Sequence, residues 1–144
     1  MSVEENKKTL YRVFEEVWNK GNLDLIPDLV SPDYVGTHAQ GVAKGHDGYE
    51  QMVKSMISFL PDLHYTVENV VGEGDILTAK VTYTGTIANG KIGDLDISGK
   101  KIKVTAVLIN RYEDGKCIES ENYSNPLNPL KQVGVTIPPE WGMG

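Results

Sequence analysis

The chain has 144 residues, of which 40% are apolar, and it carries a formal net charge of −6 with a sequence pI near 5.0. This length is typical of one domain with a single core and a modest pocket, so we expect one domain over residues 1–144. The acidic balance, without any block of consecutive basic residues, argues against nucleic acid or an anionic membrane surface as a partner.

The N-terminus is acidic and lacks the apolar core of a signal peptide, and no apolar run approaches the roughly 20 residues that a bilayer requires. We therefore expect a cytoplasmic protein. Cys117 is the only cysteine, which excludes an internal disulfide and a Cys-based metal cluster. Its place in a β pattern favours a reduced packing residue, and a catalytic thiol is the alternative.

Three helices are predicted in the N-terminal half. The first begins at Ser2, which with Glu5 has the spacing of a capping box, and ends at Gly21. Its apolar residues recur at helical spacing, at Leu10, Val13, Phe14, Val17 and Trp18. A short second helix is expected from Asp24 to the Ser31-Pro32 pair. Its apolar stripe is Leu25, Ile26, Leu29 and Val30.

A third helix is predicted after the segment from Tyr34 to Gly45, which is itself expected to be a loop or a short strand. Asp47, with Glu50 three residues later, has the spacing of a helix cap, and Pro61 sets the end. The apolar stripe of this helix is Tyr49, Met52, Val53, Met56, Ile57 and Leu60.

From Leu63 onward the apolar period changes from about 3.6 to 2 residues, which is typical of strands. A hairpin is predicted around the turn Gly72-Glu73-Gly74-Asp75. One face of it is Tyr65, Val67, Asn69 and Val71, continued by Leu77, Ala79, Val81 and Tyr83. The polar stretch from Ala88 to Gly99 is predicted to be a loop. Helices followed by antiparallel strands predict an α+β fold and exclude a doubly wound sheet.

A long strand is predicted up to the turn at Asp114-Gly115, a strong hairpin signal. One face of this strand is Ile102, Val104, Ala106, Leu108, Asn110 and Tyr112. The opposite face begins with Lys101, Lys103 and Thr105. It continues with Val107 and Ile109, which are too apolar for a solvated face. We therefore expect a homodimer that packs this face of the sheet on a second copy, and cover by the C-terminal tail is the alternative.

Five segments follow one another in a characteristic order: the run from Phe14 to Asp24, Tyr34-Val35 with His38, Gly72 to Asp75, Gly99 to Lys101, and Asp114 to Lys116. Together they resemble the SnoaL-like polyketide cyclases and the related ester-cyclase-like proteins. The resemblance covers nearly the whole chain. It implies a nuclear-transport-factor-2-like, or cystatin-like, fold: a curved antiparallel sheet wrapped around helices into a cone with an internal pocket. Such folds host enzymes and non-catalytic binders alike.

In these cyclases an aspartate beyond the last strand takes a proton from carbon, and the enolate closes a ring without cofactor or metal. Family members often have Glu-His-Trp, followed by Asp, in that region. The matching residues here are Glu119, Ser120, Glu121 and Asn125. An amide cannot abstract a proton, and general-base catalysis is worth about 10²–10⁴ in rate. Catalysis by this chain therefore requires a relocated base, and a non-catalytic binding protein is the alternative.

His38 and Asn125 are the candidate catalytic residues. A neutral imidazole is a plausible base near physiological pH, whereas a loop histidine bonded to backbone is the structural alternative for His38. Asn125 has the chemistry of an oxyanion donor, but with Pro126 after it a helix N-cap is favoured. Glu119 and Glu121 are candidate bases if they face the pocket, and exposed strand carboxylates are the more common case. His46 and His64 are expected to be solvated.

A small, largely apolar ligand is the expected partner, with Trp18, Tyr34, Tyr83, Asn110 and Tyr123 as candidate binding residues. Ordinary core packing is the alternative for these aromatics, and a satisfied core amide is the alternative for Asn110. The three histidines lie on separate elements without clustered acids, so no metal site is predicted.

Overall fold

The computed structural model describes residues 2–38, 41–125 and 127–138. The helical segments are α1 (Val3–Arg12), the π-helical η1 (Val13–Trp18), the 3₁₀ turn η2 (Leu23–Leu25), α2 (Ile26–Leu29), α3 (Gly45–Phe59) and α4 (Leu127–Gln132). The strands are β1 (Val30–His38), β2 (Gly41–Lys44), β3 (His64–Glu73), β4 (Ile76–Thr86), β5 (Lys91–Ile92), β6 (Leu95–Asp96), β7 (Lys101–Glu113) and β8 (Lys116–Ser124).

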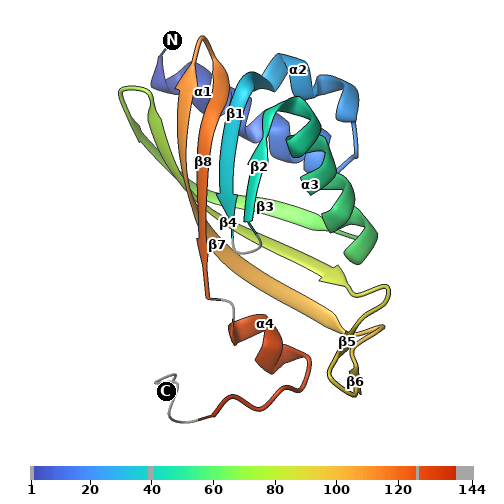
Figure 1. Cartoon of the computed structure of the whole chain (residues 1–144). Helices are drawn as coiled ribbons and strands as arrows, with labels where there is room; N and C mark the ends of the chain where they lie inside the picture. Colours follow the sequence, from blue (N-terminus) through green and yellow to red (C-terminus); the bar gives the residue numbers. More distant parts are fainter. Residues whose placement is uncertain (1, 39–40, 126, 139–144) are drawn as a thin grey trace.

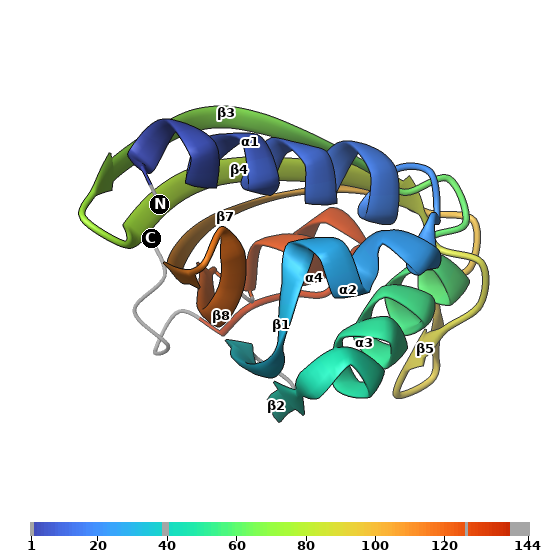
Figure 2. The same ribbon diagram turned by 90° about the horizontal axis from the view of Figure 1, so that it is seen from above.

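Six strands form one curved sheet in the order β2-β1-β8-β7-β4-β3. Its neighbouring strands are antiparallel except for β1 and β8, which run parallel. Figures 1 and 2 show α1, α2 and α3 on the concave side of this sheet. The predicted α+β fold, with a curved sheet wrapped around N-terminal helices, is confirmed.

The first predicted helix forms and presents its whole apolar stripe to the core. Ser2 accepts a hydrogen bond from the backbone N–H of Glu5 at 3.1 Å, as the capping pattern requires. The α-helix widens into the π turn η1, which has four buried residues. They are Val13, Phe14, Val17 and Trp18. A π turn is rare and is often found at functional sites, and three of these residues line the cavity described below.

The strand alternative for the segment after Tyr34 is what the structure shows, as the strand pair β1 and β2. Three other predictions were wrong. The second helix ends at Leu29 rather than at the Ser31-Pro32 pair, which belongs to β1. The third helix begins at Gly45 without a side-chain cap, so Asp47 is inside the helix rather than at its cap. The predicted loop from Ala88 to Gly99 contains the small hairpin of β5 and β6.

A register shift in β3 divides the face that alternation predicted for this strand. The pairing with β4 skips one residue between Val67 and Asn69, which is a bulge at Glu68. Tyr65, before the bulge, is buried, whereas Val71, after it, is 65% exposed. The extra residue moves Val71 to the opposite face of the sheet, because side chains alternate with a period of two.

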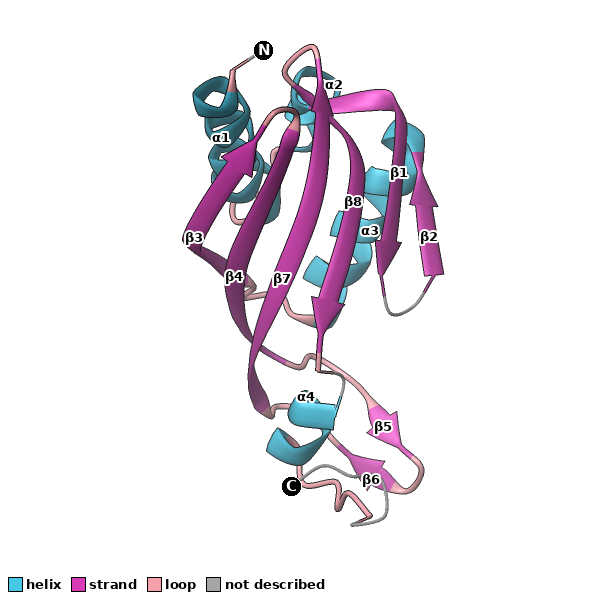
Figure 3. Ribbon diagram, turned by 90° about the vertical axis from the view of Figure 1, so that its left-hand side faces the viewer, coloured by secondary structure: helices cyan, strands magenta, loops and turns pink. Residues whose placement is uncertain are grey.

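The convex face of the sheet is not covered by any helix of the described residues, as Figure 3 shows. This face carries the outer apolar patch, which we define as Val35, Val71, Ile76, Val107, Ile109 and Tyr123. Two ion pairs lie beside the patch, Lys80 with Glu68 at 3.3 Å and Arg111 with Glu119 at 2.7 Å.

The last helix, α4, packs against the open edge of β7. The Gln132 side chain accepts from the Lys103 N–H and donates to the Lys103 carbonyl, both at 2.7 Å. Val107 and Ile109 each remain 39% exposed, so the described part of the tail does not cover them.

The helices in the described part of the chain are each too short or too polar to span a bilayer.

We predict that Asn19→Ala lowers the free energy of unfolding by about 2 kcal/mol, because it removes two hydrogen bonds. The Asn19 side chain donates to the Tyr65 carbonyl at 3.0 Å and accepts from the Tyr65 N–H at 2.7 Å, and so ties η1 to β3. Asn22→Ala is the matched control, because the Asn22 side chain donates to the Glu16 carboxylate near the surface and has no other partner among the described residues. Its cost is expected to stay within about 0.5 kcal/mol. Equal losses in urea unfolding of both variants would contradict this role.

Candidate functional site

The concave side of the sheet holds two adjoining cavities. The inner recess has a volume of about 70 Å³ and the outer cavity about 640 Å³. Walls of the inner recess include Phe14, Tyr34, Tyr49, Asn110, Tyr112 and Ser120. Walls of the outer cavity include Val42, Gln51, Met56, Phe59, Tyr83 and Ser124. Both cavities share the wall residues Trp18, His38, Met52, Tyr65 and Asn122, so the recess opens toward the larger space.

The pairing of β7 with β8 sets which polar side chains enter the cone. Asn110 pairs with Ser120, and Leu108 pairs with Asn122. Asn110 is on the buried face of β7, so its partner on β8 faces the same way, and Asn122 follows two residues later. The cone thereby receives a hydroxyl from Ser120 and an amide from Asn122. Glu119 and Glu121 pair with the outward residues Arg111 and Ile109, which is the more common placement expected for strand carboxylates.

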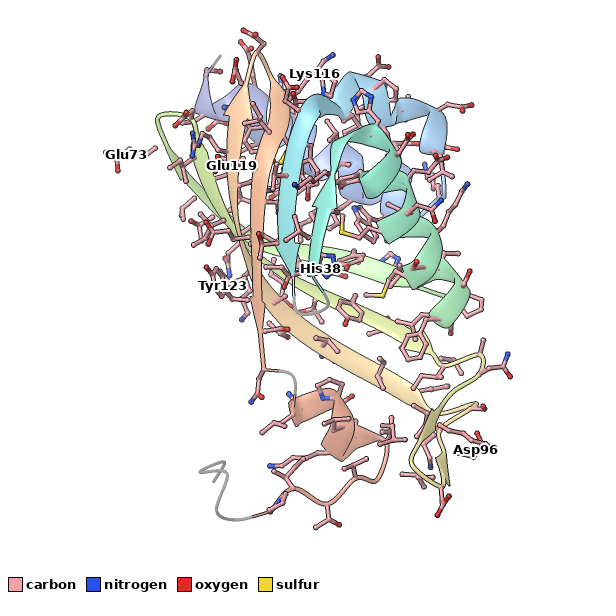
Figure 4. The ribbon with its side chains drawn as sticks, in the orientation of Figure 1. His38, Glu73, Asp96, Lys116, Glu119 and Tyr123 are labelled. Atoms are coloured by element: carbon pink, nitrogen blue, oxygen red, sulfur yellow. The ribbon has the colours of Figure 1, made fainter. Side chains whose placement is uncertain are left out.

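The strand β1 contributes to the cavity wall beside β7 and β8. Tyr34, Gly36 and His38 alternate along it and line the inner recess. Gly36 permits the position of Tyr34, because a Cβ atom on Gly36 would collide with the Tyr34 hydroxyl. Figure 4 shows His38 on the side of the sheet that faces α3. This half-buried histidine lines both cavities, at their junction.

Aromatic hydroxyls and an indole form the polar part of the recess. Trp18 Nε1 donates to the Tyr49 hydroxyl at 2.9 Å. The Tyr34 and Tyr49 rings meet edge to face, with centroids 5.1 Å apart. Asn110 Nδ2 donates to the Tyr112 hydroxyl at 3.3 Å, whereas Asn110 Oδ1 is buried and has no hydrogen-bond partner among the described residues.

Burial keeps the acidic groups of the recess protonated. It raises the pKa of Tyr34, of Tyr49 and of Tyr112 above the ordinary value of a phenol. Burial also raises the pKa of the Cys117 thiol to about 12. The reactive form of a cysteine is the thiolate, so Cys117 is a packing residue at neutral pH rather than a nucleophile.

Of the seven candidate site residues from the sequence, the structure brings five to the cavity walls. His38 and Trp18 line both cavities, Tyr34 and Asn110 line the inner recess, and Tyr83 lines the outer cavity. These residues come from η1, β1, β4 and β7, so the walls are built from both halves of the chain.

Tyr123 and Asn125 lie elsewhere. Tyr123 is 55% exposed on the convex face, where its hydroxyl donates to Glu121. Figure 4 shows Tyr123 and Glu119 on the side of the sheet away from α3. Asn125 caps α4, because its Oδ1 accepts from the Leu127 N–H at 3.0 Å. The favoured cap interpretation of Asn125 is thus what the structure shows, and Pro126 lies outside the described residues.

Sequence reasoning missed Ser120, Asn122, Tyr49, Tyr65 and Tyr112 as wall residues. The strand pattern alone does not reveal the first two. Counting across the Asp114-Gly115 turn places Glu119 opposite Asn110, but the pairing of β7 with β8 skips Ile118 and so brings Ser120 and Asn122 opposite Asn110 and Leu108.

The remaining histidines take no part in the walls. His46 was expected to be solvated, but its Nε2 lies 2.7 Å from the Val30 carbonyl and the residue is half-buried. His64 is exposed at the start of β3. Within the described ranges, no group of three or more His, Cys, Asp or Glu side chains is arranged to hold a metal ion.

We predict that Cys117 makes the fold less stable at alkaline pH. The folded thiol has a pKa of about 12, whereas a thiol in an unfolded chain titrates near about 8.5. Its stabilising contribution is full below about pH 8.5 and is lost as pH rises toward 12. Urea unfolding of the wild type should therefore lose about 1 kcal/mol between pH 8 and 9.5 beyond the loss in Cys117→Ala. Identical pH profiles for the two proteins would contradict the buried, protonated thiol.

The fold is similar to several solved structures. A protein assigned as a SnoaL-like polyketide cyclase from Jannaschia sp. CCS1 is 23% identical, with a TM-score of 0.80 over 95% of this chain and 98% of that chain. TsrD from Streptomyces laurentii is 22% identical, with a TM-score of 0.81 over 94% and 99%. IdmH from Streptomyces antibioticus, assigned as a polyketide cyclase, is 24% identical, with a TM-score of 0.77 over 90% and 99%. At these identities the likeness establishes the fold alone.

A comparison with the curated proteins finds no match. The sequence profile of the SnoaL-like polyketide cyclases, however, matches residues 8–133, which run from α1 to the residue after α4. That span contains the walls of both cavities. The chain therefore belongs to the SnoaL-like polyketide cyclase family.

Proposed function

We propose that the chain binds a small, largely apolar molecule with a few oxygens in its cone, and that His38 acts on it as a general base. The observation that carries the proposal is the position of His38 at the junction of the two cavities. The outer cavity, at about 640 Å³, is in the size range of small-molecule sites. Apolar and aromatic walls with a few polar groups are typical of such sites.

His38 is favoured as the base because of what else lines the walls. Among the described lining residues there is no Asp or Glu side chain. The buried tyrosines and Cys117 hold their protons, since burial raises their pKa values. Neutral imidazole is a proton acceptor suited to neutral pH.

The corresponding chemistry needs no cofactor. His38 takes a proton from a carbon beside a ligand carbonyl, and the electron pair of that C–H bond forms an enolate. Asn122, which lines both cavities with His38, supplies an amide N–H for the enolate oxygen. In a cyclisation, the enolate carbon then attacks a second carbonyl of the same molecule. In an isomerisation, the enolate instead takes up a proton at a different carbon. The imidazolium returns its proton to the resulting oxygen or carbon.

The second candidate function is binding without catalysis. It is favoured by the same lack of wall carboxylates among the described residues and by the structural role of Asn125 as a cap. Both functions require ligand binding in the cone. They differ in whether His38 moves a proton.

We predict that the wild type accelerates exchange of the α-protons of the bicyclic ketone 1-indanone in D₂O, and that His38→Ala abolishes the acceleration. General-base loss is expected to lower the catalysed rate by about 10²–10⁴. His64→Ala is the matched control, because His64 is exposed and lines neither cavity. Proton NMR follows exchange, and thermal unfolding checks that each variant is folded.

The outcomes separate the two functions. Ketone binding without accelerated exchange in the wild type would favour a non-catalytic binder. Full exchange activity in His38→Ala would show that His38 is not the base.

We also propose that the outer apolar patch packs on a second copy of the chain. Large apolar side chains are exposed on neighbouring strands of one sheet, and a twofold contact buries the same patch on both copies. Two ion pairs beside the patch join opposite charges of the same chain, and the Glu121 carboxylate, opposite Ile109, accepts a hydrogen bond from the Tyr123 hydroxyl.

We predict a dimer in light scattering at high micromolar concentration, and a monomer for Ile109→Lys, because the new ammonium would be buried in the contact. Leu95→Lys is the matched control: Leu95 is 38% exposed against 39% for Ile109, but lies on β6, away from the patch. A monomeric wild type, or a dimer that tolerates Ile109→Lys, would contradict the proposed interface.

A further inference from the structure

The inner recess contains a hydrogen-bond acceptor that no described protein group satisfies. Asn110 is 6% exposed on the inward face of β7, and its Nδ2 is engaged with the Tyr112 hydroxyl. Its Oδ1 is buried without a partner among the described residues. Buried polar atoms are rarely left in this state, because they lose their bonds to water without replacement.

Asn110 Oδ1 differs from the other unsatisfied buried atom because it lies in the wall of a cavity. Asn6 Oδ1 on α1 is the other buried side-chain atom without a partner in the described ranges. Asn6 lines neither cavity, whereas Asn110 lines the inner recess. An unsatisfied acceptor in the wall of a cavity can be reached by a donor that enters the cavity.

The two cavity volumes constrain the shape of such a ligand. An apolar cavity of about 150 Å³ holds a benzene ring, and the inner recess is about 70 Å³. The recess therefore holds a few atoms rather than a ring. The outer cavity, at about 640 Å³, holds the body of the ligand.

We propose that the inner recess takes a hydroxyl at the tip of an otherwise apolar ligand, and that Asn110 Oδ1 accepts the hydrogen bond of this hydroxyl. The inference rests on the proposed binding function and deepens it, since it names alcohols with an apolar body as the ligand class. An ether or ketone oxygen at the same point has no hydrogen to donate. Water can fill the recess in the free protein, and the entering hydroxyl replaces it.

Two probes of nearly equal shape test the proposal. They are 3-phenylpropan-1-ol and butylbenzene, in which a methyl group replaces the hydroxyl. The wild type should bind the alcohol more tightly. A pocket without a free acceptor prefers butylbenzene, because burial of a methyl group is favourable and loss of hydration of a hydroxyl is not. Tighter binding of butylbenzene by the wild type would overturn the proposal without any variant.

The variant Asn110→Leu removes the acceptor and keeps a side chain of similar size. The ratio of the two dissociation constants, measured by calorimetry, should shift about tenfold toward butylbenzene. Asn89→Leu makes the same substitution at an exposed loop residue and should leave the ratio unchanged. An equal ratio in wild type and Asn110→Leu would overturn the role of Asn110 while leaving the binding function intact. If neither probe binds the wild type, both the binding function and this inference fail.

Discussion

The alternation of side chains along β7 is the constraint on which both faces of the molecule depend. Every second residue from Ile102 to Tyr112 is buried, and every intervening residue is exposed. Pairing with β8 extends this alternation, so that Ser120 and Asn122 face the cone while Glu121 and Tyr123 face outward. A shift of one residue in this pairing would exchange the cavity wall for the convex surface.

The inner recess combines polar atoms with deep burial. Tyr34, Tyr49 and Tyr112 keep their hydroxyl protons because burial raises their pKa values, so they are donors rather than bases. The proposed base is accordingly at the junction with the outer cavity, where His38 is half-buried. Under the proposed function, the closed inner recess recognises the ligand and the wider outer cavity is where the proton is transferred. The proposal also fits the role of Asn125, which stands where the resemblance expects a carboxylate and which caps α4 instead.

The sequence predicted the features that depend on local pattern. The stripe of the first helix, the hairpin of β3 and β4 and the alternation of β7 follow from apolar periodicity, and Asp114-Gly115 forms the tight turn with positive φ at both residues. Features that depend on tertiary pairing were beyond this reasoning. The bulge at Glu68 reversed the face of Val71, and the parallel pairing of β1 with β8 placed His38 near Asn122. The resemblance named Asn125 as a candidate catalytic residue, whereas the pairing of the strands places Asn122 in the cavity wall.

A crystal structure of the protein with 3-phenylpropan-1-ol would test the central claim most directly, because it locates the ligand in the cone. The account predicts density for the phenyl ring in the outer cavity and for the chain in the inner recess. The hydroxyl oxygen should lie within about 2.6–3.2 Å of Asn110 Oδ1. A cone filled by its own side chains, or an alcohol bound on the convex face of the sheet, would contradict it.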